Sequence, residues 1–257
     1  MAVWSSPRGG FHSVSYSSLF LYRIKQGPAA LTGGVGFQDI LKKKHLRLPA
    51  FEFTLAFTTT TKGAPNMKYR ESGMPEEELW NTFFQPASWL RKMGVTPSIR
   101  TLVDVGCGYG TFLVPAARII HGTAVGIDID DQMMERCREK ASEFNLTNLE
   151  LIEGEVTDVR TASSLKAYQG TVDYVAFFNI LHCEEPMELL AFAYRLLEEK
   201  GKLGVMHWKY EDTPRGPSMG IRPKPESILD WAQRSGFTLQ GKVHLKPFHY
   251  GLIFQKS

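Results

Sequence analysis

Three glycines alternate with other residues directly after a short apolar run. The run covers residues 102–105 and contains one acid, Asp104, and then Gly106, Gly108 and Gly110 follow. Glycine has no Cβ, so a loop of this composition can adopt positive φ and let a ligand approach its backbone amides. The stretch therefore predicts a strand that ends at a loop holding a nucleotide-like ligand.

Further polar side chains follow other strand-like segments of the chain. They stand at or near the carboxyl ends of those segments: Asp128, Glu155, Asn179, His182 and His207. Open α/β sheets bind their ligands at the carboxyl ends of parallel strands. We therefore expect these side chains to lie near the glycine loop.

The elements that must position these residues alternate between strand and helix. A nearly continuous apolar run such as 172–178 is typical of a strand covered on both faces. We expect a helix starting near Pro75, with Leu79, Trp80, Phe83 and Phe84 on one face. We also expect Met133 and Met134 to lie in the core. The predicted strands are 101–105, 123–129, 149–153, 172–178 and 202–208, and the predicted helices between them are 111–120, about 130–144, 158–168 and a last one ended by Gly201 as its C-cap.

The alternation changes near the C-terminus. A predicted helix at 226–235 is followed by two strand-like runs, 238–245 and 250–255, which only a few residues connect. Parallel strands need a dozen or more linking residues, so this pair must be an antiparallel hairpin. The count is then seven strands.

The glycine loop also distinguishes between two kinds of nucleotide fold. A dinucleotide fingerprint would place its third small residue at position 111, where this chain has Thr111, whereas the third glycine is Gly110. Together with Asp104 and the closing hairpin, this pattern resembles class I S-adenosylmethionine-dependent methyltransferases over about residues 76–256. The resemblance implies an α/β, Rossmann-like fold: a seven-stranded, mostly parallel sheet of order 3-2-1-4-5-7-6 with an antiparallel last strand and helices on both faces.

The resemblance further implies S-adenosylmethionine as the cofactor and suggests a role for each matching position. The three glycines would shape the loop under the methionine part, and Asp104 would orient the loop or the cofactor ammonium. Asp128 would accept from both ribose hydroxyls, since an ionised carboxylate has only acceptor capacity. The remaining cofactor-binding positions are Glu155 at the adenine amino group, Asn179 near the transferred methyl, and the neighbouring Cys107, Ile129 and Val156.

The methyl acceptor is less well defined by the sequence. The resemblance to quinone-biosynthesis enzymes and their generic relatives favours a small molecule, with His182 or His207 as a general base. Equally, an activated sulfonium methyl needs only an aligned acceptor, and both histidines would then be structural. The alternatives are a protein or RNA methyltransferase, or a non-catalytic S-adenosylmethionine-binding domain that works through a partner.

Composition excludes several other classes of protein. Residues 1–66 carry eight Lys or Arg against two Asp or Glu, so the patterned remainder is slightly acidic and offers no large basic face for nucleic acid. This part of the chain also lacks the Asn/Asp-Pro-Pro-Tyr motif of amino-methylating DNA enzymes. The three cysteines, Cys107, Cys137 and Cys183, have no metal-type spacing, so we expect reduced thiols and no metal site. No apolar run reaches the roughly 18–20 residues of a membrane span.

The first 66 residues differ in composition from the rest of the chain. No acid precedes Asp39, and six serines precede Leu19, which resembles an organelle transit peptide. A disordered extension, or an over-extended reading frame with its true start at Met67, fits the same composition. We therefore expect an extension over 1–66 and a methyltransferase domain over 67–257. The expected location is the cytoplasm, or an organelle if the extension is a transit segment, and the oligomeric state stays open.

Overall fold

The computed structural model describes residues 3–5, 11–13 and 75–257. The chain divides into two units, Met1–Lys62 and Gly63–Ser257. In the first unit, β1 (Val3–Ser5) pairs antiparallel with β2 (Phe11–Ser13). The other residues of the predicted extension, and the candidate start at Met67, lie outside the described residues.

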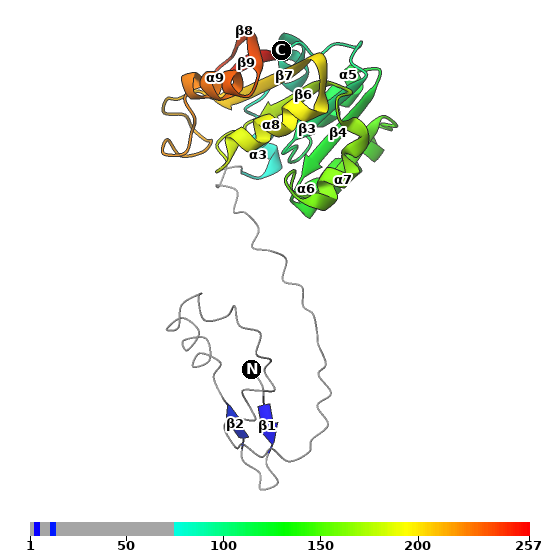
Figure 1. The fold of residues 1–257 in the computed structure, drawn as a ribbon, viewed down its shortest axis with the longest axis vertical. Helices are drawn as coiled ribbons and strands as arrows, with labels where there is room; N and C mark the ends of the chain where they lie inside the picture. Colours follow the sequence, from blue (N-terminus) through cyan, green and yellow to red (C-terminus); the bar gives the residue numbers. More distant parts are fainter. Residues whose placement is uncertain (1–2, 6–10, 14–74) are drawn as a thin grey trace, which may run out of the picture. The chain divides into compact units, whose positions relative to one another are not determined.

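Seven strands form one sheet in the larger unit (Figure 1). Their order is β5-β4-β3-β6-β7-β9-β8. The first five strands in this order are parallel to one another, and β9 runs antiparallel to both β7 and β8. Counted along the chain from β3, this is the predicted order 3-2-1-4-5-7-6, which is thereby confirmed. The strands are β3 (Thr101–Val105), β4 (Thr123–Asp128), β5 (Leu149–Glu153), β6 (Val172–Phe178), β7 (Leu197–Trp208), β8 (Phe237–Leu245) and β9 (His249–Lys256).

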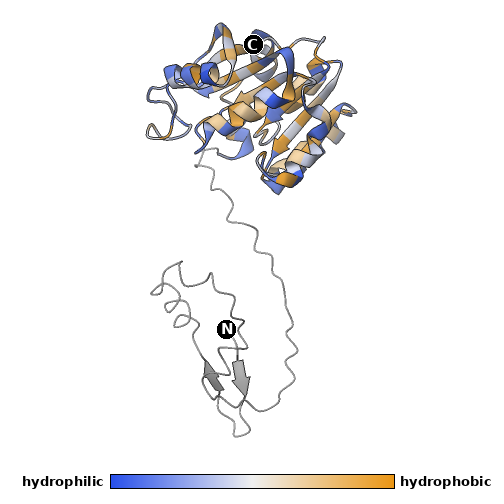
Figure 2. Ribbon diagram, viewed as in Figure 1, coloured by the Kyte–Doolittle hydropathy of each residue, from blue (hydrophilic) through white to orange (hydrophobic). Residues whose placement is uncertain are grey.

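Helices cover both faces of this sheet and bury one apolar cluster on each. Side chains of α8 and α9 join the cluster on one face, and side chains of α4, α5 and α6 join the cluster on the other. The central strands are correspondingly apolar along most of their length (Figure 2). The helices are α3 (Glu77–Asn81), α4 (Pro86–Lys92), α5 (Leu113–Ile119), α6 (Asp131–Glu143), α7 (Val159–Ser164), the 3₁₀ turn η2 (Lys166–Tyr168), α8 (Pro186–Leu196) and α9 (Pro225–Arg234).

Alternation along the strands decides which residue joins which cluster. In β3, Val103 and Val105 pack into the α8/α9 cluster, whereas Leu102 between them packs into the α4/α5 cluster. Successive side chains of a strand point to opposite faces, so an apolar strand supplies both cores at once. The strands β3, β4 and β6, whose carboxyl ends lie at one edge of the sheet, are therefore packed against apolar side chains on both faces.

Two expectations about the helices were wrong. The helix predicted from Pro75 is only five residues long and ends at Asn81, and a second helix starts at Pro86, because a proline suits a first helical turn but disfavours helix in the residue before it. Gly201 does not cap a helix. The preceding helix ends at Leu196, and Leu197 already pairs with Val172 of β6, so strand pairing replaces the predicted cap.

Candidate active site

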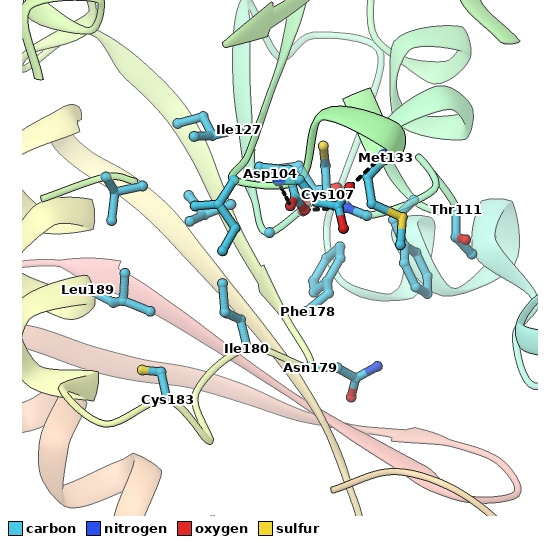
Figure 3. Close-up of a pocket in the computed structure, with 18 of the residues that line it drawn as sticks. Asp104, Cys107, Thr111, Ile127, Met133, Phe178, Asn179, Ile180, Cys183 and Leu189 are labelled. Atoms are coloured by element: carbon cyan, nitrogen blue, oxygen red, sulfur yellow. Dashed lines mark hydrogen bonds between the residues drawn. The ribbon is translucent and has the colours of Figure 1, made fainter. Parts of the chain in front are cut away.

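A pocket of about 260 Å³ opens at the carboxyl ends of β3, β4 and β6 (Figure 3). Eight of the ten predicted cofactor-binding residues line it, namely Asp104, Gly106, Cys107, Gly108, Asp128, Ile129, Val156 and Asn179. They come from four separate segments of the sequence. The fold therefore brings most of the predicted site together in one place.

The glycine loop adopts the backbone that its composition favours. Gly106, Gly108 and Gly110 all have positive φ, at 71°, 52° and 71°. At Gly106 an added Cβ would lie 2.5 Å from Cδ1 of Ile180, so a larger residue would have to displace that side chain as well as adopt a strained backbone. Gly110 does not line the pocket. An added Cβ there would lie 2.9 Å from Sγ of Cys137, so this glycine serves to seat the loop on α6.

Asp128 ends β4 with its carboxylate at the pocket wall. Its Oδ2 accepts from the backbone N–H of Gly108 at 2.8 Å, and its Oδ1 accepts from the N–H of Asp130 at 3.1 Å. Burial raises the pKa of Asp128, and the backbone hydrogen bonds, first that from Gly108, act against that rise. Each carboxylate oxygen has a second lone pair, so the side chain can also accept from a diol in the pocket.

Asp104 is a buried acid at the floor of the pocket. Only 3% of the residue is exposed, and burial, followed by the charge of Asp128, raises its pKa to about 8. At neutral pH its carboxyl group therefore holds a proton in the ligand-free protein. A cation bound in the pocket would lower the pKa of Asp104 and favour its ionised form, which could then form an ion pair with that cation.

Asn179 offers a buried, unpaired acceptor to a ligand in the pocket. Its backbone has a φ of 59°, a left-handed conformation that asparagine tolerates better than most residues. Its Oδ1 is buried and has no hydrogen-bond partner among the residues that the structure describes. A buried amide oxygen without a partner costs free energy, so a donor from a bound molecule fits this position.

The two predicted catalytic histidines differ in their access to the pocket. His182 lines it, together with its neighbour Cys183. His207 is fully buried and does not line it, and its ring centroid lies 5.7 Å from that of His182. Burial, and next the charge of His182, hold the pKa of His207 well below its usual range. His207 therefore lies next to His182 but outside the pocket lining.

Glu155 also lies outside the pocket lining, whereas its neighbour Gly154 contributes to it.

Other residues line the pocket although the sequence did not predict them there. Met133, expected in the core, lines the pocket, whereas the adjacent Met134 is fully buried. A one-residue shift on α6 turns a side chain by about 100°, and the helical spacing alone did not show which methionine faces the sheet.

The short helix α3 brings Trp80 to the pocket and is held there by polar contacts. Glu77 forms ion pairs with Arg136 (2.6 Å) and Lys140 of α6. Thr111 Oγ1 donates to Oδ1 of Asn81 at 3.0 Å. Burial alone would raise the pKa of Glu77, but the hydrogen bonds from Lys140 and Arg136 outweigh it and hold the pKa below its usual range. No sequence pattern signals these pairs, because their members are far apart along the chain.

The described residues contain neither a metal-binding cluster nor a membrane-spanning helix. Within them, no group of three or more His, Cys, Asp or Glu side chains could hold a metal ion. Among the same residues, no helix has the length and apolar character needed to cross a membrane.

Comparison with known proteins agrees with the site. Residues 102–201 match the family described as "Methyltransferase domain". A demethylmenaquinone methyltransferase of Listeria monocytogenes is 29% identical over 116 residues, which are 44% of this chain and 46% of that protein. A ribosomal protein L11 methyltransferase of Clostridium botulinum is 37% identical over 59 residues, 23% of this chain and 19% of that protein. The chain thus spans less than half the length of these curated relatives.

The fold has the same kind of relatives among solved structures. The crystal structure of a SAM-dependent methyltransferase from Aquifex aeolicus superimposes with a TM-score of 0.61 at 21% identity, covering 68% of this chain and 91% of that one. Sheet order, glycine loop and pocket define a Rossmann-like domain that holds a nucleotide-type ligand. Within that class, the family match over residues 102–201 supports a class I S-adenosylmethionine-dependent methyltransferase domain.

Proposed function

We propose that this protein binds S-adenosylmethionine in the described pocket and transfers its methyl group to a small-molecule acceptor. The observation that carries the proposal is the convergence of Asp104, Asp128 and the buried, unpartnered Oδ1 of Asn179 on one pocket beside a positive-φ glycine loop. These groups offer acceptors for an ammonium, a diol and a further donor. That set matches the polar groups of S-adenosylmethionine.

The roles follow from the chemistry of each group. Asp128 accepts from both ribose hydroxyls, and Asp104 ionises and pairs with the ammonium. Gly106 and Gly108 keep side chains away from the methionine part, and Gly110 supports the loop from α6. Ile129 and Val156 offer apolar contacts to the adenine, and Cys107 completes the wall. Glu155, which lies outside the pocket lining, is the least supported of these assignments.

When bound, the sulfonium supplies an activated methyl group, so the protein needs to align the acceptor and to dispose of its proton. His182 is our candidate for the proton acceptor because it lines the pocket. The buried neighbour His207, which stays neutral, acts on the orientation of His182. The proposed role requires His182 to be a neutral imidazole, because both ring nitrogens of an imidazolium are donors and neither can accept a proton.

The small-molecule acceptor is the favoured choice for one reason. The match to the demethylmenaquinone enzyme covers 116 residues, whereas the match to the ribosomal protein enzyme covers 59. The rival proposals are a protein or RNA acceptor, and a domain that binds the cofactor without turnover. The three cysteines are buried and none forms a disulfide, which supports a cytoplasmic or other reducing location.

The test uses the full-length chain, tritiated S-adenosylmethionine and a deproteinised metabolite extract. The expected result is label in a small product. Label in protein or RNA of a whole-cell extract would show instead that the acceptor is a macromolecule. Binding by calorimetry without any label transfer would favour the non-catalytic rival.

The cofactor site itself is tested by Asp128→Ala. Loss of a charged hydrogen bond costs about 1.5–3 kcal/mol, so the Kd for S-adenosylmethionine should rise at least about tenfold in calorimetry. Asp131→Ala, three residues further on in the exposed first turn of α6, is the matched control and should leave the Kd within about twofold. An unchanged Kd for Asp128→Ala would sink the ribose assignment.

A further inference from the structure

The segment between β7 and α9, drawn beside α9 in Figure 1, folds around one buried arginine. Arg222 is 7% exposed, and its guanidinium donates six hydrogen bonds to five acceptor oxygens of this segment. The partners are Pro217 O (3.0 Å from Nε and 2.8 Å from Nη2), Lys209 O (2.9 Å), Glu211 O (2.8 Å), Thr213 Oγ1 (2.9 Å) and Arg215 O (3.4 Å).

These contacts hold the segment by its backbone. Four of the five partners are main-chain carbonyls, and none of the ion pairs found in the described part of the chain includes Arg222. A guanidinium presents five donors in a planar fork, whereas an ammonium presents three from a single atom. Arginine is therefore the side chain that can bind these carbonyls together, and lysine cannot replace it.

The segment in turn lies against Trp208 at the end of β7. Gly216 has a φ of +104°, and an added Cβ would lie 2.7 Å from Cδ2 of the Trp208 indole. Only a residue without a side chain lets the backbone pass at this distance. Lys209 N also donates to Phe248 O at 2.8 Å, so the segment is tied to the turn between β8 and β9 as well.

Trp208 connects this segment to the pocket. It is fully buried, and its ring centroid lies 6.3 Å from that of Trp80, which lines the pocket. Phe83 packs edge-on against the same indole at 5.6 Å. Aromatic contacts at these separations are close-packed, so a shift of Trp208 must move its neighbours.

We propose that Arg222 is a positioning residue for the pocket: by fixing the segment over Trp208, it fixes Trp80 at the pocket wall. The chain of contacts runs from Arg222 through the backbone at Gly216 to Trp208 and Trp80. Trp80 comes from α3, whereas Asp104 and Asp128 come from β3 and β4. Arg222 therefore acts on the binding of the acceptor more than on the binding of the cofactor, a consequence that rests on the proposed function.

The first test needs no acceptor. The full-length chain is labelled with 5-fluorotryptophan, and its ¹⁹F signals are assigned with Trp80→Phe and Trp208→Phe. Arg222→Lys should shift or broaden the signals of both Trp208 and Trp80. Arg215→Lys, an exposed arginine of the same segment, is the matched control and should leave both unchanged. An unchanged Trp80 signal in folded Arg222→Lys would overturn the proposal.

Gly216→Ala serves as an independent variant if Arg222→Lys does not fold. It perturbs the same connection at the indole and should also move the Trp80 signal. If it folds and the Trp80 signal stays in place, the proposed connection does not exist.

The second test measures acceptor use with a serially diluted metabolite extract and labelled S-adenosylmethionine. Arg222→Lys should raise the half-saturating extract concentration at least about fivefold, while the Kd for the cofactor stays within about twofold. An equal loss at all extract concentrations, or a matching loss of cofactor affinity, would contradict a positioning role. If the wild-type protein binds cofactor but transfers no label, the proposed function fails, and the fluorine signals still decide the role of Arg222.

Discussion

Asp104 illustrates how a residue can be destabilising in the free protein and useful in the complex. Its pKa of about 8 lies well above the 3.8 of an unperturbed Asp, mainly because the side chain is buried. The folded protein thus holds a proton that the unfolded chain has lost between these pH values. Stability from this group is complete below pH 3.8 and is lost as the pH rises toward 8.

We therefore expect Asp104→Asn to stabilise the ligand-free protein at pH 7–8, by up to about 4 kcal/mol, and to lose the advantage near pH 4. The same variant should bind S-adenosylmethionine at least about tenfold more weakly, because an amide cannot pair with an ammonium as a carboxylate does. Thermal melts across pH and calorimetry measure the two effects. A variant that is destabilised at pH 8 would contradict the buried, protonated state.

His249 has the opposite pH dependence. It is fully buried, both ring nitrogens are without a hydrogen-bond partner in the described residues, and its ring packs 4.1 Å from Trp208. Burial, and next the charge of Arg222, lower its pKa to about 3. The unfolded chain therefore binds the extra proton first, and stability present above pH 6.5 is lost as the pH falls toward 3.

Replacing His249 by Phe should accordingly flatten the fall in melting temperature between pH 6.5 and 4, over which this group contributes up to about 3 kcal/mol. The exposed His244 of β8 offers the control, since His244→Gln should leave the profile unchanged. A wild-type slope in His249→Phe would show that the acid sensitivity comes from other groups, such as His207.

At the scale of elements, α3 depends on its contacts with α6. A five-residue helix has too few hydrogen bonds to be stable alone. The ion pairs of Glu77 with Arg136 and Lys140 fix it over the pocket, and the lowered pKa of Glu77 means that this contribution is present above about pH 4.5 and is lost as the pH falls through the lower value.

Glu77→Gln should leave the fold intact, with a loss of about 1 kcal/mol or less, because ion pairs near the surface are weak. In the labelled-cofactor assay its half-saturating extract concentration should rise several-fold, since Trp80 is no longer held at the pocket, while the Kd for S-adenosylmethionine stays within about twofold. Glu139→Gln removes the other, exposed acid paired with Arg136 and should change neither quantity. Equal effects in the two variants would show that α3 is positioned without this pair.

At the scale of the whole molecule, every described residue that lines the pocket comes from the larger unit, Gly63–Ser257. Deleting residues 1–66 should therefore shift the melting temperature by less than about 3 °C and the cofactor Kd by less than about twofold. Deleting residues 1–84 also removes α3 and should raise the half-saturating extract concentration in the labelled-cofactor assay. A drop of many degrees in the shorter deletion would show that the predicted domain boundary is misplaced.

The sequence by itself determined the seven strands, the antiparallel final pair and the glycine loop, and the strand order followed from the resemblance that these features carry. Gly106, Gly108 and Gly110 act through their own backbone, the connection before β9 is too short for a crossover helix, and apolar runs identify strands covered on both faces. Each of these signals is local, so it can be read from neighbouring residues. The place of Asp128 at the pocket follows from the same logic, because it ends the strand next to β3, although its role toward a ribose is still a prediction.

Only the tertiary structure decided which side chains of this set share the pocket. It placed Gly154 at the wall instead of Glu155, set His207 behind His182, and turned Met133 toward the pocket. It also joined Glu77 to α6 and folded the segment before α9 around Arg222. These outcomes depend on distances between residues remote in sequence and on small rotations of helices. A periodic pattern gives the buried face of a helix only approximately, and it contains no information about which distant partner that face will meet.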